Sequence, residues 1–192
     1  TVVVDHDSGR LVWASPGRDR ATVRAFFDAL EASGQGRCAQ ITHVSADGAE
    51  WIADVVRDRC PDAIRCADPF HVVGWATEAL DAVRRQAWNT ARRQGNTRNH
   101  GWAHGRRHTV ATGPALALRR ARYALWKNPE NLTDRQQVKL EWIAKTDPRL
   151  YRAYLLKEGL RTIFKLPADQ AAEALDSWVA WARRCRIESF VT

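Results

Sequence analysis

Three aspartates each follow a short run of apolar or β-branched residues, at a point where a strand would end: Asp5, Asp47 and Asp68. On neighbouring strands, such carboxylates can hold two divalent ions about 3.5–4 Å apart, which activate a nucleophile and stabilise the leaving oxygen in phosphoryl transfer. Oxygen ligands favour Mg²⁺ or Mn²⁺. An aspartate after a strand also serves as an ordinary helix cap or turn residue. Spacing alone therefore leaves both interpretations open.

The four cysteines offer a second kind of site. Cys60, Cys66 and His71 are spaced Cys-x5-Cys-x4-His, but structural zinc prefers close ligand pairs and a fourth ligand. The cysteines form no CxxC pair, which favours buried free thiols in a reducing cytoplasm over a disulfide framework. The sequence also contains no glycine-rich phosphate loop, no GxSxG and no HExxH motif.

Positive charge is concentrated in the middle of the chain. The 192 residues carry a formal net charge of +8, yet the stretch from Ala82 to Pro129 contains no Asp or Glu and by itself carries +11. Its cations are Arg84, Arg85, Arg92, Arg93, Arg98, Arg106, Arg107, Arg119, Arg120, Arg122 and Lys127. A run of one sign, interleaved with aromatic residues, favours a polyanion partner and predicts contacts with nucleic-acid phosphates. The alternative is a solvated basic surface.

The residues around the three aspartates alternate between strand and helix patterns. Thr1–Asp5 and Leu11–Ala14 are separated by His-Asp-Ser-Gly, which predicts a hairpin. Further strands are predicted over Ala39–Val44 and Ala63–Ala67, and helices over Arg20–Ala32, Ala49–Arg59 and about Pro69–Arg93. This alternation is typical of an α/β fold, in which strand ends can bring the carboxylates together.

The second half of the chain has only helical patterns. Gln94–Pro114, with four glycines and three histidines, predicts a loop in which Trp102 either packs or stacks on an unpaired base. Helices follow over Leu116–Lys127, from the Thr133 capping box to about Lys145, over Asp147–Lys165 and over Ala168–Arg186. The expected domains are residues 1–93 as an α/β part, 94–114 as a basic glycine-rich loop and 115–192 as an all-helical domain.

The stretch between Val44 and Arg85 resembles the transposases of bacterial insertion sequences, in particular the ISL-three family. The motifs that carry the resemblance are a strand-end Asp47 before a helix, Pro61-x-Ala63, Asp68-x-Phe70-His71, and the A-L-D-x-V-R-R run from Ala79 to Arg85. RYALWKNPENLT and LYRAYLLKEGLRTIF resemble the helical part of the same family. The resemblance therefore spans essentially the whole chain.

The resemblance implies a fold and an activity. It implies a partial ribonuclease-H-like core, with a mixed sheet and flanking helices, followed by an all-α insertion domain. A triad of two aspartates and a glutamate in such a core binds Mg²⁺ or Mn²⁺, cuts transposon ends and joins them to target DNA. The first triad aspartate belongs on the first strand, the second at the fourth strand, and the glutamate in a later Asn-x-x-Glu helix.

The family's strand order assigns roles to the aspartates. It makes Thr1–Asp5 the second strand, places the first strand upstream, and matches Asp47 to the second triad aspartate, a metal ligand. Asp68 and His71 then lie beside the active site, where His71 either contacts phosphate or packs at a helix start. Asp5 is a weaker catalytic candidate, and Glu188 lacks the context of the triad glutamate. Taken alone, the chain is expected to be inactive.

Two other functions remain open. One is a non-enzymatic DNA-binding or regulatory truncated transposase, and the other is an unrelated metal-dependent nuclease that uses Asp5, Asp47 and Asp68 together. For the transposase, the expected partners are DNA at transposon ends and target sites, and further copies of the protein on DNA. Its expected location is the bacterial cytoplasm, at the nucleoid when bound to DNA, because the sequence has no membrane span or signal peptide.

Overall fold

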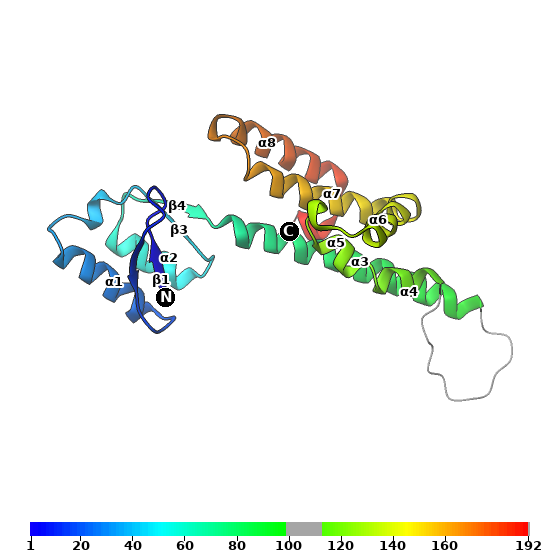
Figure 1. Cartoon of the computed structure of the whole chain (residues 1–192), viewed down its shortest axis with the longest axis horizontal. Coiled ribbons are helices and arrows are strands. Elements are labelled where there is room, and N and C mark those ends of the chain that lie inside the picture. The colour runs from blue at the N-terminus through cyan, green and yellow to red at the C-terminus, as the bar shows by residue number, and fades with distance from the viewer. Residues whose placement is uncertain (99–112, 192) are drawn as a thin grey trace. The chain divides into compact units, whose positions relative to one another are not determined.

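The computed structural model describes residues 1–98 and 113–191, with the side chains of residues 96–98 outside the description. The chain divides into two compact units, Thr1–Val72 and Val73–Thr192. Its described residues are predominantly helical and form two small sheets, which confirms the α/β class (Figure 1). No helix among them is long and apolar enough to cross a membrane.

The first unit contains both sheets. Strands β1 (Val2–Val4) and β2 (Leu11–Ala14) pair antiparallel, and β3 (His43–Ala46) pairs parallel with β4 (Ile64–Ala67). The predicted hairpin is confirmed. Its turn is closed by hydrogen bonds from the Asp5 N–H to the Arg10 carbonyl and from the Gly9 N–H to the Asp5 carbonyl. Gly9 has φ 66°, a left-handed conformation that glycine adopts without steric cost.

The helices of the first unit are α1 (Arg20–Ala32) and α2 (Glu50–Arg59), which lie side by side. The predicted span of α1 is confirmed at both ends, and its Asp19 cap accepts a hydrogen bond from the Thr22 N–H. The buried face of α1 packs with that of α2 around Phe26, Phe27 and Val55, and Val3 and Trp13 of the hairpin cover the same cluster.

The predicted strand over Ala39–Val44 is displaced toward the C-terminus. A short 3₁₀ helix occupies Cys38–Gln40, and β3 begins only at His43. The cause is a side chain from the preceding helix, because the Glu31 carboxylate accepts hydrogen bonds from the Gly36 and Cys38 N–H groups and holds this segment in a turn. The displacement brings the end of β3 to Ala46, directly before Asp47.

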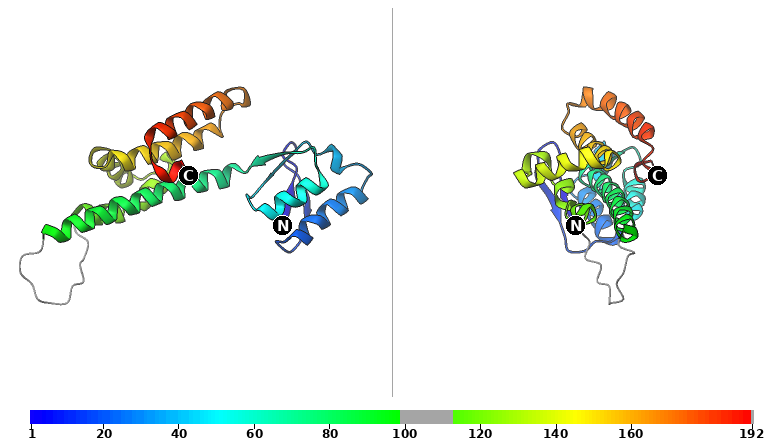
Figure 2. Two further views of the ribbon diagram at one scale, coloured as in Figure 1. Left: turned by 180° about the vertical axis from the view of Figure 1, so that it is seen from behind. Right: turned by 90° about the vertical axis from the view of Figure 1, so that its right-hand side faces the viewer.

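The second unit is helical. It contains most of α3 (Pro69–Arg98), together with α4 (Gly113–Arg119), α5 (Arg122–Trp126), α6 (Asp134–Thr146), α7 (Pro148–Ile163) and α8 (Ala168–Cys185). Two short 3₁₀ helices lie at Pro129–Asn131 and Glu188–Phe190. The capping box at Thr133 is confirmed. Figure 2 shows α7 and α8 side by side.

Two predictions about the helices of this unit are wrong. Gln94–Arg98 were predicted to belong to a loop, but they are helical and form the end of α3. The single helix predicted over Leu116–Lys127 is two helices, α4 and α5, separated by a turn at Arg120 and Ala121. Residues 99–112, including Trp102, lie outside the described residues.

The helical core explains why the two units divide near the start of α3. Leu80 and Val83 of α3 are buried with Leu125, Ile143 and Leu150 in one cluster. This packing draws most of α3 into the second unit, so the boundary between the compact units falls between Val72 and Val73. The α7–α8 contact is close because Gly159 has no side chain. A Cβ there would lie 3.2 Å from the Trp178 ring.

Candidate functional site

Asp47 and Asp68 follow paired strands at the same edge of a sheet. In the parallel β3–β4 pair, Ala46 is opposite Ala67. The next residue on each strand is an aspartate, so both carboxylates lie at the carboxyl ends of neighbouring strands. This is the arrangement that the sequence pattern predicts for these two residues, and it depends on the register of β3 against β4.

The Asp47 carboxylate is held on both of its oxygens. Oδ1 accepts a 2.7 Å hydrogen bond from the Ala49 N–H, and Oδ2 accepts one of 2.9 Å from the Arg18 guanidinium. The bond from Ala49 is the main cause that lowers the pKa of Asp47 below its ordinary value, and Arg18 and the charge of His71 add to it. Asp47 is therefore a carboxylate at neutral pH.

Asp68 and His71 form a pair at the start of α3. His71 Nδ1 lies 2.7 Å from Asp68 Oδ2, and the Phe70 N–H bonds to Oδ1 at 3.0 Å. The His71 contact is the largest cause that lowers the pKa of Asp68. Both side chains are about one-third exposed, so they remain open to solvent. The structure thus gives His71 a carboxylate partner at the strand edge.

Asp5 has a structural role in the β1–β2 turn. Its carboxylate accepts hydrogen bonds from the Ser8 hydroxyl and the Asp7 N–H, and these bonds lower its pKa. The Asp5 carboxylate is thus bonded within its own turn.

The described part of the chain does not by itself supply a complete metal site. No group of three or more His, Cys, Asp or Glu side chains placed to hold a metal ion occurs among the described residues. Hard divalent cations take six or more oxygen ligands, whereas this edge offers Asp47 and Asp68, and Arg18 already lies on Asp47. These residues therefore fit a metal ion only if further ligands come from elsewhere.

Cys60, Cys66 and His71 likewise form no metal-binding cluster among the described residues. Cys66 is exposed on β4, whereas Cys60 is buried beside Cys38 in the core of the first unit. Burial raises the pKa of the Cys60 thiol to about 11, and the neighbouring Cys38 thiol adds to this shift. Both buried thiols are therefore protonated at neutral pH and behave as core residues.

The basic residues of the second unit differ in exposure. Arg84 is 7% exposed, and its Nε bonds to Asp81 at 2.7 Å, so it is a core ion pair and not a surface cation. Arg85 is exposed but also pairs with Asp81, at 3.4 Å. The side chains of Arg98, Arg106 and Arg107 lie outside the description. The other exposed cations of the predicted set are Arg92, Arg93, Arg119, Arg120, Arg122 and Lys127.

Two of the exposed arginines lie over tryptophan rings. The Arg122 guanidinium is 3.8 Å from the centre of the Trp126 ring, and that of Arg92 is 5.4 Å from the centre of the Trp88 ring. Cation–π contacts of this kind hold a guanidinium in place at the surface while leaving its N–H groups able to donate. Both guanidinium groups therefore have a tryptophan ring as a neighbour at the surface.

Sequence reasoning missed Arg18 as a partner of Asp47 at the carboxyl ends of β3 and β4. Arg18 lies 29 residues before Asp47, in the turn before α1. No local spacing identifies it, because it reaches Asp47 through the tertiary fold.

Comparison with known proteins gives a consistent result. A family model described as "Transposase", of the ISL-three DDE type, matches residues 1–192. The chain is 64% identical over 196 residues to a transposase for insertion sequence element IS1557 from Mycobacterium tuberculosis. It is 28% identical over 195 residues to a transposase for IS1001 from Bordetella parapertussis. The whole chain is covered in both, but it spans only 43% of each relative's length. No solved structure gives a significant match.

Proposed function

The chain belongs to the ISL-three family of DDE transposases, and from that premise we propose that it is part of an enzyme that moves an insertion sequence by cutting and joining DNA. In the whole protein, water and later a DNA 3′-hydroxyl attack phosphodiester bonds in line. The first unit contributes part of a ribonuclease-H-like catalytic core, and the helical second unit is an insertion that contacts DNA.

The observation that carries the catalytic part of the proposal is the pairing of β3 with β4. It puts Asp47 and Asp68 on adjacent strand ends, with His71 beside them. Asp47 is the second triad aspartate in this proposal and ligates the metal. Asp68 and His71 position phosphate or water next to it. Asp5 is the least favoured of the four, because its carboxylate is bonded within the hairpin turn.

The metal in the whole protein is Mg²⁺ or Mn²⁺, as the oxygen donors favour. Bound there, it would activate the attacking hydroxyl group and stabilise the leaving oxygen. The chain's own contribution is Asp47, whose pKa is lowered and which is therefore ionised at neutral pH. Arg18 contacts Oδ2 of Asp47, and this hydrogen bond can coexist with a bound ion because each carboxylate oxygen has two lone pairs.

The DNA-binding part of the proposal rests on the exposed cations of the second unit. Arg92, Arg119, Arg120, Arg122 and Lys127 are exposed, and they lie in a stretch without a single carboxylate. Contacts from such side chains go to phosphates, which position DNA without reading its sequence. Arg84 is removed from the predicted set, because it is buried against Asp81.

A cleavage assay tests the catalytic proposal. Full-length protein carrying this chain should nick insertion-sequence ends with Mg²⁺, and Asp47→Asn should abolish nicking. Asp176→Asn, at an exposed carboxylate on α8 in the other unit, should leave nicking unchanged. The 192-residue chain alone should bind DNA without cutting it. If this chain alone nicks DNA and Asp47→Ala abolishes the nicking, its own carboxylates suffice for cleavage. That result would refute the proposal that the chain contributes only part of the catalytic core.

Two alternatives give different results in the same assay. A regulatory truncated transposase would bind DNA in a salt-dependent way and never cut it, even as the full-length protein. A nuclease built on Asp5, Asp47 and Asp68 would lose cleavage equally when any one of the three is replaced. The hydrogen bonds of Asp5 within its own turn favour the transposase over this nuclease.

The proposed cellular location and self-association follow from the proposed activity. We place the protein in the bacterial cytoplasm, at the nucleoid when it is bound to DNA, and we expect copies to associate on DNA because two ends must be brought together. Size measurements of the full-length protein with and without end DNA test the association. A monomer on paired ends would count against it.

A further inference from the structure

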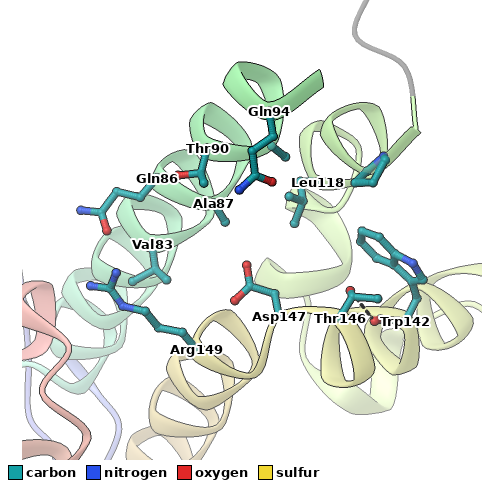
Figure 3. A pocket seen from close by; sticks show the side chains of 12 residues that line it. Val83, Gln86, Ala87, Thr90, Gln94, Leu118, Trp142, Thr146, Asp147 and Arg149 are labelled. Atoms are coloured by element: carbon teal, nitrogen blue, oxygen red, sulfur yellow. Dashed lines mark hydrogen bonds between the residues drawn. The ribbon is translucent and has the colours of Figure 1, made fainter. Parts of the chain in front are cut away.

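The helical unit contains a pocket for which the proposed chemistry has no use. Its volume is about 450 Å³, and it lies between α3, α4, α6 and the start of α7 (Figure 3). Val83, Ala87 and Leu118 give it an apolar wall, and the Trp142 indole lies on another side. The volume is within the range of pockets that bind small organic groups. The strand-edge site involves none of these residues.

Polar groups face the middle of this pocket from opposite sides. Figure 3 shows the Gln94 amide pointing in from α3 and the Asp147 carboxylate pointing in from the start of α7. Asp147 Oδ1 caps α7 by accepting from the Leu150 N–H at 3.0 Å, and a carboxylate has acceptor capacity beyond one such bond. The Thr146 hydroxyl is turned away, since it donates to the Trp142 carbonyl at 2.7 Å.

This set of groups matches a flat aromatic ring with hydrogen-bonding edges. An indole provides a stacking surface, a carboxylate accepts from an exocyclic amine, and an amide both donates and accepts. Nucleobases have these features, whereas an aliphatic ligand would leave the Asp147 carboxylate facing apolar atoms. The small side chains of Ala87 and Ala91 leave room for a ring at the apolar wall.

The charge around the pocket favours a base that belongs to a nucleic acid. Arg149 lines the pocket, Arg93 lies on α3 three residues beyond Thr90, and Lys145 lies on α6 three residues beyond Trp142. Arg149 is therefore the cation that lines the pocket, and Arg93 and Lys145 lie about one helical turn from two other lining residues. Asp147 is the one carboxylate among the described lining residues. A polyanion can therefore approach with its backbone on the rim.

We propose that this pocket holds a single unpaired base of the DNA, stacked on Trp142, with its polar edge facing Gln94 and Asp147. The proposal rests on the DNA contact proposed above for the helical unit. A base within a duplex cannot enter, because both its faces are stacked and its edge is paired, so the site selects DNA with an extruded or unpaired nucleotide. The neighbouring cations bind the flanking phosphates.

The test compares two short duplexes that differ at one position. One carries a single bulged adenine, and the other carries an abasic spacer in its place. Anisotropy titrations at one fixed salt concentration should show the 192-residue chain binding the bulged adenine about tenfold tighter, the gain typical of one stacked base. 2-Aminopurine at the bulge should lose fluorescence on binding, because it stacks on the indole.

The variants separate stacking from general affinity. Trp142→Leu should remove the tenfold preference and leave binding of the abasic duplex unchanged, and Trp142→Phe should restore most of the preference. Tyr123→Leu, which removes an exposed aromatic side chain elsewhere in the same unit, should leave the preference intact. Circular dichroism checks that each variant is folded. If Trp142→Leu unfolds, the test rests on whether the wild-type chain and Trp142→Phe quench the 2-aminopurine fluorescence.

Two results would overturn the pocket proposal. One is equal binding of the two duplexes by the wild-type chain without quenching, and the other is an undiminished preference in folded Trp142→Leu. In both cases the salt-dependent phosphate contact would survive, so the DNA-binding part of the proposed function would stand. Absence of binding to either duplex would refute that part and the base pocket together.

Discussion

A lysine buried in the helical unit makes a sharp stability prediction. The Lys157 side chain is 1% exposed, and its ammonium pairs with Glu158, whose side chain is 12% exposed. Glu158 also accepts from Arg161 Nε at 2.8 Å, and Arg161 reaches Glu130 with two further bonds of 2.9 and 3.0 Å. One carboxylate thus compensates two cations, one of which has almost no contact with water.

Removing the carboxylate should cost far more than removing the lysine. Glu158→Gln leaves the Lys157 ammonium buried without a counter-charge, a change that typically costs about 3–5 kcal/mol. Lys157→Met removes the desolvated charge and keeps the chain length, while Glu158 still pairs with Arg161. Its effect should lie within about 1 kcal/mol of zero or be stabilising. The double variant should recover most of the loss, because no uncompensated ammonium remains.

The same lysine predicts how stability depends on pH. Burial lowers the pKa of Lys157 below its ordinary 10.5, although Glu158 opposes the shift. Between the lowered value and 10.5 the unfolded chain binds more protons than the folded one, so the free energy of unfolding rises with pH there. Burial raises the pKa of Tyr154 to about 12, which reverses the slope above about pH 10. Lys157→Met should therefore remove the increase in the free energy of unfolding with pH below about pH 10.

The assay is urea denaturation followed by circular dichroism at a helical wavelength, with a fit that allows two transitions, because two units need not unfold together. Lys165→Met is the matched control. Lys165 is 61% exposed and lies 3.6 Å from Glu130, so its loss should change stability by less than about 1 kcal/mol. A cost below about 1 kcal/mol for Glu158→Gln, or no recovery in the double variant, would refute the reasoning.

Three further predictions concern ion pairs and DNA contacts. Asp81→Leu should destabilise the helical unit by about 3–5 kcal/mol in the same urea assay, because it leaves buried Arg84 unpaired, and a small loss would contradict the buried pair. Arg120→Ala should reduce the slope of log affinity against log salt by about 0.9 if Arg120 contacts a phosphate, and an unchanged slope would exclude that contact. Arg18→Ala should raise the pKa of Asp47, measured by carboxyl-carbon NMR, yet leave it below 3.8, since the stronger bond from the Ala49 N–H remains.

Local sequence patterns accounted for much of the secondary structure. The apolar spacing in Arg20–Ala32 and the glycine turn after Asp5 depend on residues a few positions apart, and both predictions are confirmed. The errors arose where a more distant group acts. The Glu31 carboxylate binds the backbone at Cys38 and displaces the following strand, and the buried residues near Leu80 join α3 to the helical core.

The candidate sites divide in the same way. The sequence by itself determined which carboxylates end strands, where the positive charge accumulates and which family the motifs resemble. Only the tertiary structure decided that the Asp81–Arg84 pair of α3 is buried, that Arg18 reaches Asp47, and that Trp142 lines a pocket with α3. The physical reason is that helix and strand patterns report which face a residue takes, whereas burial and ion pairing depend on what packs against that face from distant parts of the chain.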